Sequence, residues 1–168
     1  MTAAAATPGE DVTEVPEQDA VYRPLGTYAV LTAGFLGLVG ASLGHAARRD
    51  RLPMRVSLAD LALVGVASHK LSRLVATDEV TAFARAPFVE VRAGKNGDVE
   101  EEPRGKGPRR AIGELVTCPS CVGQWLAAGL FVGHLFAPRT TRAVSSIFVV
   151  DAISDFLHVG YRGLKDRA

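Results

Sequence analysis

The chain has 168 residues, enough for one domain, and its 19 Lys and Arg nearly balance its 18 Asp and Glu. This balance excludes a strongly basic surface of the kind that binds nucleic acid. The two cysteines form a single Cys-x-x-Cys motif, so a disulfide framework is also excluded. Residues 1–24 are acidic and rich in Ala, Thr and Pro, without apolar periodicity. We expect a disordered tail there rather than a secretory signal, followed by a membrane helical domain over residues 25–168.

Three apolar stretches predict membrane-spanning helices. Residues 25–47 and 115–138 contain no Asp, Glu, Lys or Arg, and residues 143–161 are apolar apart from three side chains. About 20 apolar residues in helical form cross a bilayer core of about 30 Å. The first stretch carries small residues on one stripe, at Ala33, Gly37, Gly40 and Gly44. We expect this stripe to pack within the monomer in preference to forming a dimer seam.

A further helix is predicted over residues 57–76, with Ser57 as N-cap and Asp60 in the first turn. Only residues 61–68 lie between Asp60 and the next polar group. Such a segment reaches about 12 Å at 1.5 Å per residue, which is too short to span a bilayer. This helix therefore either lies at the membrane interface or is held deep by other helices.

Residues 77–113 form a polar loop with a predicted β-hairpin. Residues 88–92 alternate in polarity, and Asn96-Gly97 is a typical two-residue hairpin turn. If Lys95 pairs with Asp98, Arg92 lies opposite Glu101. We expect residues 100–110 to be a loop, and a short amphipathic helix over residues 109–116 to follow it.

These elements predict an all-α integral membrane bundle of three spanning helices and one shorter interfacial or partly buried helix. With three spans and the N-terminus outside, 16 Lys and Arg lie inside. With four spans and the N-terminus inside, 11 lie inside, 6 outside and 2 within the second helix. We prefer the first arrangement. Both predict a multi-pass protein of the cell membrane with Cys118 and Cys121 at the cytoplasmic face.

The cysteine motif permits three interpretations. Pro119 suits the first position of a helix, which makes Cys118 the N-cap and places Cys121 in the first turn. The pair could shape the start of that helix. It could bind zinc with His69, another side chain or a second protomer, because zinc needs four ligands. It could also form a thiol–disulfide site in which Cys118 is the nucleophile and Cys121 the resolving thiol, although the cytoplasm keeps thiols reduced.

The last predicted helix carries a polar stripe. Asp151, Asp155, His158 and Arg162 fall within an arc of about 60°. Ionisable groups inside a membrane are costly and need partners. Three residues of the helix over 57–76 offer counter-charges: His69, Lys70 and Arg73. We expect an electrostatic clamp between the two helices; a ligand-binding or catalytic site and a proton pathway are the alternatives.

Basic residues flank the predicted helices, and we expect them to contact anionic lipid headgroups. They are Arg48, Arg49, Arg51, Arg104, Lys106, Arg109 and Arg110. Glu100 to Glu102 interrupt the basic pattern, and no nucleic-acid reader motif is present. The expected partners are therefore the lipid bilayer and either a second copy of the chain or another membrane protein.

The chain resembles the bacterial membrane family known as domain of unknown function 1360. The resemblance covers roughly residues 57–162 and rests on linked strings. These are Ala67-Ser68-His69-Lys70-Leu71-Ser72-Arg73, Asp78-x-Val80-Thr81, Arg85-Ala86-Pro87-Phe88, Glu101-Glu102-Pro103-Arg104-Gly105 and the run from Arg109 to Trp125 that contains Cys118-Pro119-x-Cys121. It implies a small integral membrane protein without an assigned activity, similar to a sporulation-associated protein, in which His69, Arg73, Cys118 and Cys121 belong to one unit.

The leading hypothesis from sequence is a non-enzymatic membrane interaction or assembly protein. In this hypothesis the cysteine motif organises the cytoplasmic face, with zinc as a cofactor that could be bound there. The rival hypothesis is a membrane-bound thiol–disulfide oxidoreductase that uses Cys118 and Cys121. Proton-coupled transport along Asp151, Asp155 and His158 ranks third.

Overall fold

The computed structural model describes residues 24–93 and 99–167, and the predicted tail and hairpin turn lie outside these residues. The described chain is mainly helical, as predicted. The elements are α1 (Leu25–Arg48), α2 (Leu58–Thr77), the 3-10 turn η1 (Glu79–Thr81), α3 (Ala82–Arg85), β1 (Val89–Ala93), β2 (Val99–Pro103), α4 (Pro108–Thr117), α5 (Pro119–Phe136) and α6 (Pro138–Lys165). Two helices, α1 and α6, are long and apolar enough to cross a membrane, and α4 with α5 would make a third, bent span.

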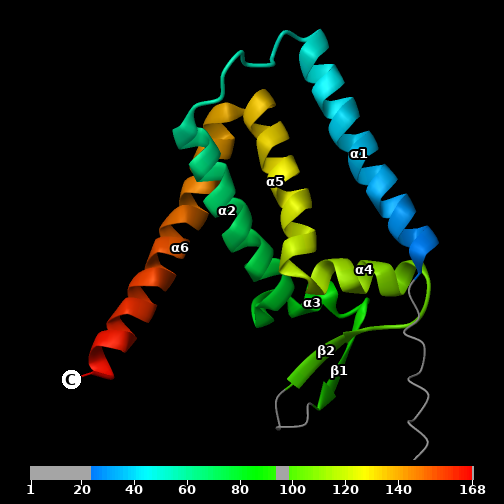
Figure 1. Ribbon diagram of the computed structural model, residues 1–168, viewed down its shortest axis with the longest axis vertical. Helices are drawn as coiled ribbons and strands as arrows, with labels where there is room; N and C mark the ends of the chain where they lie inside the picture. Colours follow the sequence, from blue (N-terminus) through cyan, green and yellow to red (C-terminus); the bar gives the residue numbers. More distant parts are fainter. Residues whose placement is uncertain (1–23, 94–98, 168) are drawn as a thin grey trace, which may run out of the picture.

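α2 is the central helix of the bundle and packs against both α5 and α6 (Figure 1). It begins as the sequence predicts, because the Ser57 hydroxyl accepts a hydrogen bond from the backbone N–H of Asp60 at 3.0 Å. Its buried face carries small side chains, among them Ala67, Ser68 and Ser72. These small residues let α5 and α6 approach closely, so α2 packs between its two neighbours.

The helices alternate in direction (Figure 1). The connection between α1 and α2 and the connection between α5 and α6 lie at one end of the bundle. The hairpin, α4 and the C-terminal end of α6 lie at the other. The preferred three-span arrangement kept residues 48–117 on one side. The structure separates the basic turn after α1 from the hairpin, because α2 runs the length of the bundle between them.

α1 packs against α4 and α5 through its larger side chains. Phe35 meets Trp125 edge to face, with ring centroids 5.1 Å apart, and His45 lies beside Phe136. The small-residue stripe faces the opposite way, and all four of its members are exposed. A Cβ added at Gly37, Gly40 or Gly44 would meet nothing within 4 Å. The expectation that this stripe packs within the monomer is therefore wrong, because aromatic contacts turn it outward.

The predicted hairpin forms, with a register one residue away from the expected one. Arg92 lies opposite Glu100, and Val91 lies opposite Glu101. Opposite residues in an antiparallel pair share a face of the sheet, so this register places Glu101 on the same face as the buried Val89. β2 extends to Pro103, where a loop was expected, whereas the predicted amphipathic helix is present as α4.

Candidate functional site

The Cys-x-x-Cys motif forms the bend between α4 and α5, whose axes differ by 84°. Cys118 is the only residue between the two helices and has an extended backbone. Its Sγ accepts a hydrogen bond from the backbone N–H of Cys121 at 3.3 Å, and Pro119 occupies the first helical turn. Both thiols are free, with Cys118 half-buried and Cys121 exposed. Cys118 therefore acts as the N-cap of α5, in agreement with the sequence analysis.

The residues considered for zinc do not form a metal cluster. Within residues 24–93 and 99–167, no three His, Cys, Asp or Glu side chains are placed to hold one metal ion. His69 lies near the motif and lines a cavity of about 350 Å³ together with Pro119 and Ser120. Tetrahedral zinc would thus need ligands beyond those that this part of the chain brings together.

Cys121 borders a cavity of about 450 Å³ between α1 and the α4–α5 bend. Phe35 and Trp125 form part of its apolar wall. Its polar wall includes Glu114, which accepts hydrogen bonds from the Tyr28 hydroxyl and from Arg110. An exposed thiol thus lies beside a space that has both apolar and polar walls.

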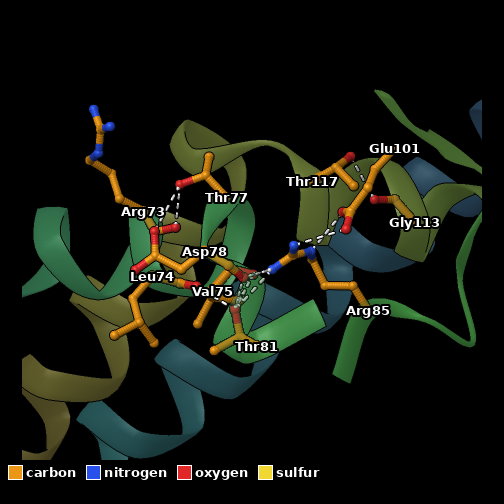
Figure 2. A network of polar contacts seen from close by, with 10 residues as sticks. All are labelled: Arg73, Leu74, Val75, Thr77, Asp78, Thr81, Arg85, Glu101, Gly113 and Thr117. Atoms are coloured by element: carbon orange, nitrogen blue, oxygen red, sulfur yellow. Dashed lines mark hydrogen bonds and ion pairs between the residues drawn. The ribbon is translucent and has the colours of Figure 1, made fainter. Parts of the chain in front are cut away.

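Arg85 is a buried cation that connects α2 to the hairpin (Figure 2). Its Nη1 donates to the carbonyl oxygens of Val75 at 2.8 Å and Asp78 at 3.0 Å, and to the Thr81 hydroxyl at 2.9 Å. Nε and Nη2 bind the two carboxylate oxygens of Glu101 at 2.8 and 3.0 Å. The last carbonyls of a helix lack partners within it, so Arg85 completes the C-terminal end of α2.

Sequence reasoning did not identify this contact. Arg85 and Glu101 both lie in the strings that carry the family resemblance, and that was the available signal. Their pairing depends on the hairpin register, because a shift of one residue would turn Glu101 to the other face of the sheet.

α4 lies directly on the hairpin at Gly113. A Cβ at this position would be 2.6 Å from the carbonyl oxygen of Phe88 and 3.1 Å from Cβ of Pro103. Arg109 adds a second contact by donating to the carbonyl oxygen of Pro87 at 2.8 and 2.6 Å. The hairpin, α4 and the cysteine bend therefore form one connected unit, which we call the hairpin–bend unit (residues 78–93 and 99–121).

The structure brings Lys70 of α2 to the polar stripe of α6. The Lys70 Nζ lies 2.6 Å from Asp155 and 3.2 Å from Asp151. Lys70 is therefore placed between two carboxylates of the neighbouring helix. These contacts match the expected geometry of a clamp between the two helices. His69, Arg73, His158 and Arg162 line a cavity beside it together with Asp155.

A second ion pair joins α2 to α6 near the opposite end of the bundle, and sequence reasoning missed it. Arg142 Nε and Nη2 donate to the two oxygens of Asp60 at 2.7 and 2.8 Å, and His134 Nε2 lies 3.6 Å from the same carboxylate. The hydrogen bonds from Arg142 and then Ser57 hold the pKa of Asp60 well below its usual range. Local sequence pattern predicts only a first-turn role for Asp60, because its partner lies 82 residues away.

The residues expected at lipid headgroups lie at both ends of the bundle. Arg48 ends α1, and Arg49 and Arg51 follow it. Arg104 and Lys106 precede α4, and Arg109 and Arg110 lie in its first turn. Several of these side chains bind the protein itself. Arg51 Nη1 donates to the carbonyl oxygen of Phe136 at 3.1 Å, Arg109 binds Pro87, and Arg110 binds Glu114 at 3.0 Å.

Comparison with known proteins places this architecture in a family. Residues 63–161, more than half of the chain, match the family described as a protein of unknown function (DUF1360). The chain belongs to the DUF1360 family. The match runs from α2 to α6 and includes the hairpin–bend unit and the Lys70 contacts, while α1 precedes it. The resemblance derived from sequence is thereby confirmed.

Two relatives of this DUF1360 chain come from Bacillus subtilis (strain 168). UPF0713 protein YngL is 32% identical over 98 residues, which cover 57% of this chain and 72% of the relative. Sporulation protein YjcA is 27% identical over 101 residues, which cover 58% of this chain and 86% of the relative. No solved structure matches the chain.

Proposed function

We propose that this DUF1360 protein is a non-enzymatic assembly protein of the cell membrane. In this proposal α1 binds a partner helix within the bilayer, and the hairpin–bend unit faces the cytoplasm. The chain would then act by bringing a partner to a rigid cytoplasmic surface that the cysteine bend holds in place.

The exposed face of α1 is the observation that carries this proposal. The helix uses one side for Phe35 and the other aromatic contacts, and it turns Gly37, Gly40 and Gly44 away from the bundle. Small residues at such spacing let two helix backbones approach closely, which is how many membrane helices associate. Because an identical stripe can pair with itself, a second copy of the chain is the simplest partner.

Replacement of one stripe glycine tests this proposal. Gly37→Leu places a large side chain on the stripe, and we expect it to weaken self-association in a bilayer at least about tenfold. Gly34→Leu is the matched control, because Gly34 is also open on α1 but lies off the stripe. Energy transfer between labelled copies in lipid vesicles gives the readout. A monomeric wild-type chain, or equal effects of the two changes, would contradict self-association.

A thiol–disulfide oxidoreductase is the alternative function, favoured by the exposed Cys121 thiol beside the 450 Å³ cavity. In that reaction Cys118 and Cys121 would lose two protons and two electrons to an acceptor as their S–S bond forms. Zinc binding by the four thiols of two copies is a variant of the assembly proposal.

Two replacements of Cys118 separate these roles. A serine hydroxyl can cap a helix as well as or better than a thiol, so Cys118→Ser should keep the fold if the residue only shapes the bend. Cys118→Ala should then cost about 1 kcal/mol of stability. For redox or metal chemistry the two replacements should be equally damaging, with a wild-type disulfide or bound zinc lost in both. Thermal unfolding, thiol counting and metal analysis on the purified protein provide the measurements.

A further inference from the structure

The polar cavity between α2 and α6 contains positive charge that the protein does not neutralise. It has a volume of about 510 Å³ and is lined by residues of both helices. Lys70 is held by Asp151 and Asp155, and these three groups together carry one negative charge, so that Arg73 and Arg162 leave the cavity with one net positive charge. The guanidinium groups of Arg73 and Arg162 also face this cavity, and neither has a hydrogen bond or ion pair with the rest of the described chain.

The other arginines near this end of the bundle are used differently. Arg85, Arg109 and Arg110 all bind carboxylates or carbonyl oxygens of the protein. Figure 2 shows the Arg73 side chain directed away from the Arg85 network, with no contact drawn to its guanidinium group. The charge of Arg73 attracts Asp155, but no hydrogen bond from its guanidinium N–H groups is present within the described residues, so these donors can bind an external group.

The arrangement of the lining residues indicates the chemistry of that group. His69 and Arg73 are four residues apart on α2, and His158 and Arg162 are four residues apart on α6, so each pair occupies one helix face. Guanidinium groups that two helices contribute to one cavity, with imidazoles in the same lining, suit an oxyanion that accepts several hydrogen bonds. Arginine binds phosphate in this way through two parallel N–H donors.

The position of the cavity fits the depth of a lipid headgroup. Arg73 lies one turn before the end of α2, at the end of the bundle where α4 and the hairpin lie. α6 has 28 residues, and roughly 42 Å of helix exceeds the roughly 30 Å of a bilayer core. Its last turns, which include Arg162, therefore extend to the membrane surface. Phe156 and Val159 add exposed apolar wall beside the charges.

We propose that this cavity binds a phosphate group, with Arg73 and Arg162 as its main ligands. The phosphate could be carried by an anionic lipid headgroup or by a soluble phosphate ester, because both present the same phosphate oxygens to the arginines. Basic pockets between membrane helices bind anionic lipid headgroups in other proteins.

The test uses the full-length protein in detergent and three probes: dioctanoyl phosphatidic acid, dioctanoyl phosphatidylcholine and inorganic phosphate. Thermal unfolding and native mass spectrometry report binding. The double variant Arg73→Gln/Arg162→Gln should bind phosphatidic acid about 100-fold more weakly, at roughly tenfold for each charge-assisted contact. The control Arg55→Gln/Arg139→Gln removes the same charge at the opposite end of the bundle, and its binding should equal that of the wild type.

The probes also identify the source of the phosphate. Tight binding of phosphatidic acid, with weak binding of inorganic phosphate and of phosphatidylcholine, supports a lipid headgroup. Equal binding of phosphatidic acid and inorganic phosphate supports a soluble phosphate ester. Binding that is unchanged in the Arg73→Gln/Arg162→Gln variant would overturn the proposal, as would the absence of binding by both phosphate probes. Unfolding without ligand verifies that each variant is folded.

Discussion

At the residue scale, Arg85 stabilises a junction that backbone hydrogen bonds alone would leave incomplete. Its side chain is only 3% exposed, and it binds Glu101 as well as carbonyl oxygens at the end of α2. Breaking an ion pair whose cation is buried is costly, whereas an exposed ion pair contributes little. Stability of the hairpin–bend unit therefore depends strongly on this one side chain.

We expect Arg85→Gln to lower the free energy of unfolding by about 3 kcal/mol, because Glu101 would remain without its cation. Arg92→Gln is the control: Arg92 pairs with Glu90 and Glu102 on the exposed face of the hairpin, and its loss should cost less than about 1 kcal/mol. Unfolding in mixed detergent micelles measures both values. Similar costs for the two variants would show that Arg85 is not the critical contact.

At the scale of elements, ion pairs hold α6 to α2 at two positions along the helices. Asp60 binds Arg142 near the start of each helix, and Lys70 binds Asp155 further along. Between them, small buried residues such as Ser68 and Ala152 let the two helices approach. The pairs thus set the alignment of α6 on α2, and with it the shape of the polar cavity.

The Asp60 contact makes this alignment sensitive to acid. The pKa of Asp60 is lowered in the folded protein, so its contribution is complete above the unfolded pKa near 4 and decreases as the pH falls toward the lower folded pKa. We expect Asp60→Asn to lower the unfolding temperature most at pH 7, and the difference from the wild type to narrow progressively as the pH falls below about 4.

Unfolding temperatures from pH 7 to pH 2.5 test this expectation. Asp166→Asn, an exposed change after α6, is the control and should follow the wild type at every pH. A difference between Asp60→Asn and the wild type that does not vary with pH would mean that ionisation of Asp60 contributes nothing to the alignment.

At the scale of the whole molecule, the alternating helices place successive connections at opposite ends of the bundle. The turn after α1 and the segment before α4 lie at opposite ends of the bundle (Figure 1). The count of Lys and Arg in the sequence favours a three-span arrangement, which keeps both segments on the same side of the membrane. A four-crossing arrangement with the hairpin inside also has more basic residues inside than outside, in accordance with the usual charge bias.

Labelling with a membrane-impermeant thiol reagent tests the arrangement. In a chain with Cys118→Ser and Cys121→Ser, we expect Met54→Cys to react in intact cells and Lys106→Cys to react only after the membrane is opened. Both positions are exposed in the structure, so accessibility within the protein is matched. Reaction of both from the same side would instead support a chain in which α2 does not cross.

Several local features could be predicted from the sequence because they depend on neighbouring residues. Ser57 and Cys118 precede a helix start, and each caps its helix as expected. The hairpin could be predicted from alternation and Asn96-Gly97, although its register could not. Register depends on which face meets the helices, and here Glu101 is drawn to Arg85, a residue outside the hairpin.

The helices, their apolar character, the cap at the cysteine bend and the family could be predicted from the chain, because these follow from short-range pattern and composition. Which charges meet and which faces stay open depends on how the helices pack. Asp60 and Arg142 are 82 residues apart, and no local pattern links them. The outward turn of the glycines on α1 likewise depends on which side of the helix fits against Trp125, and that is a property of packing between helices.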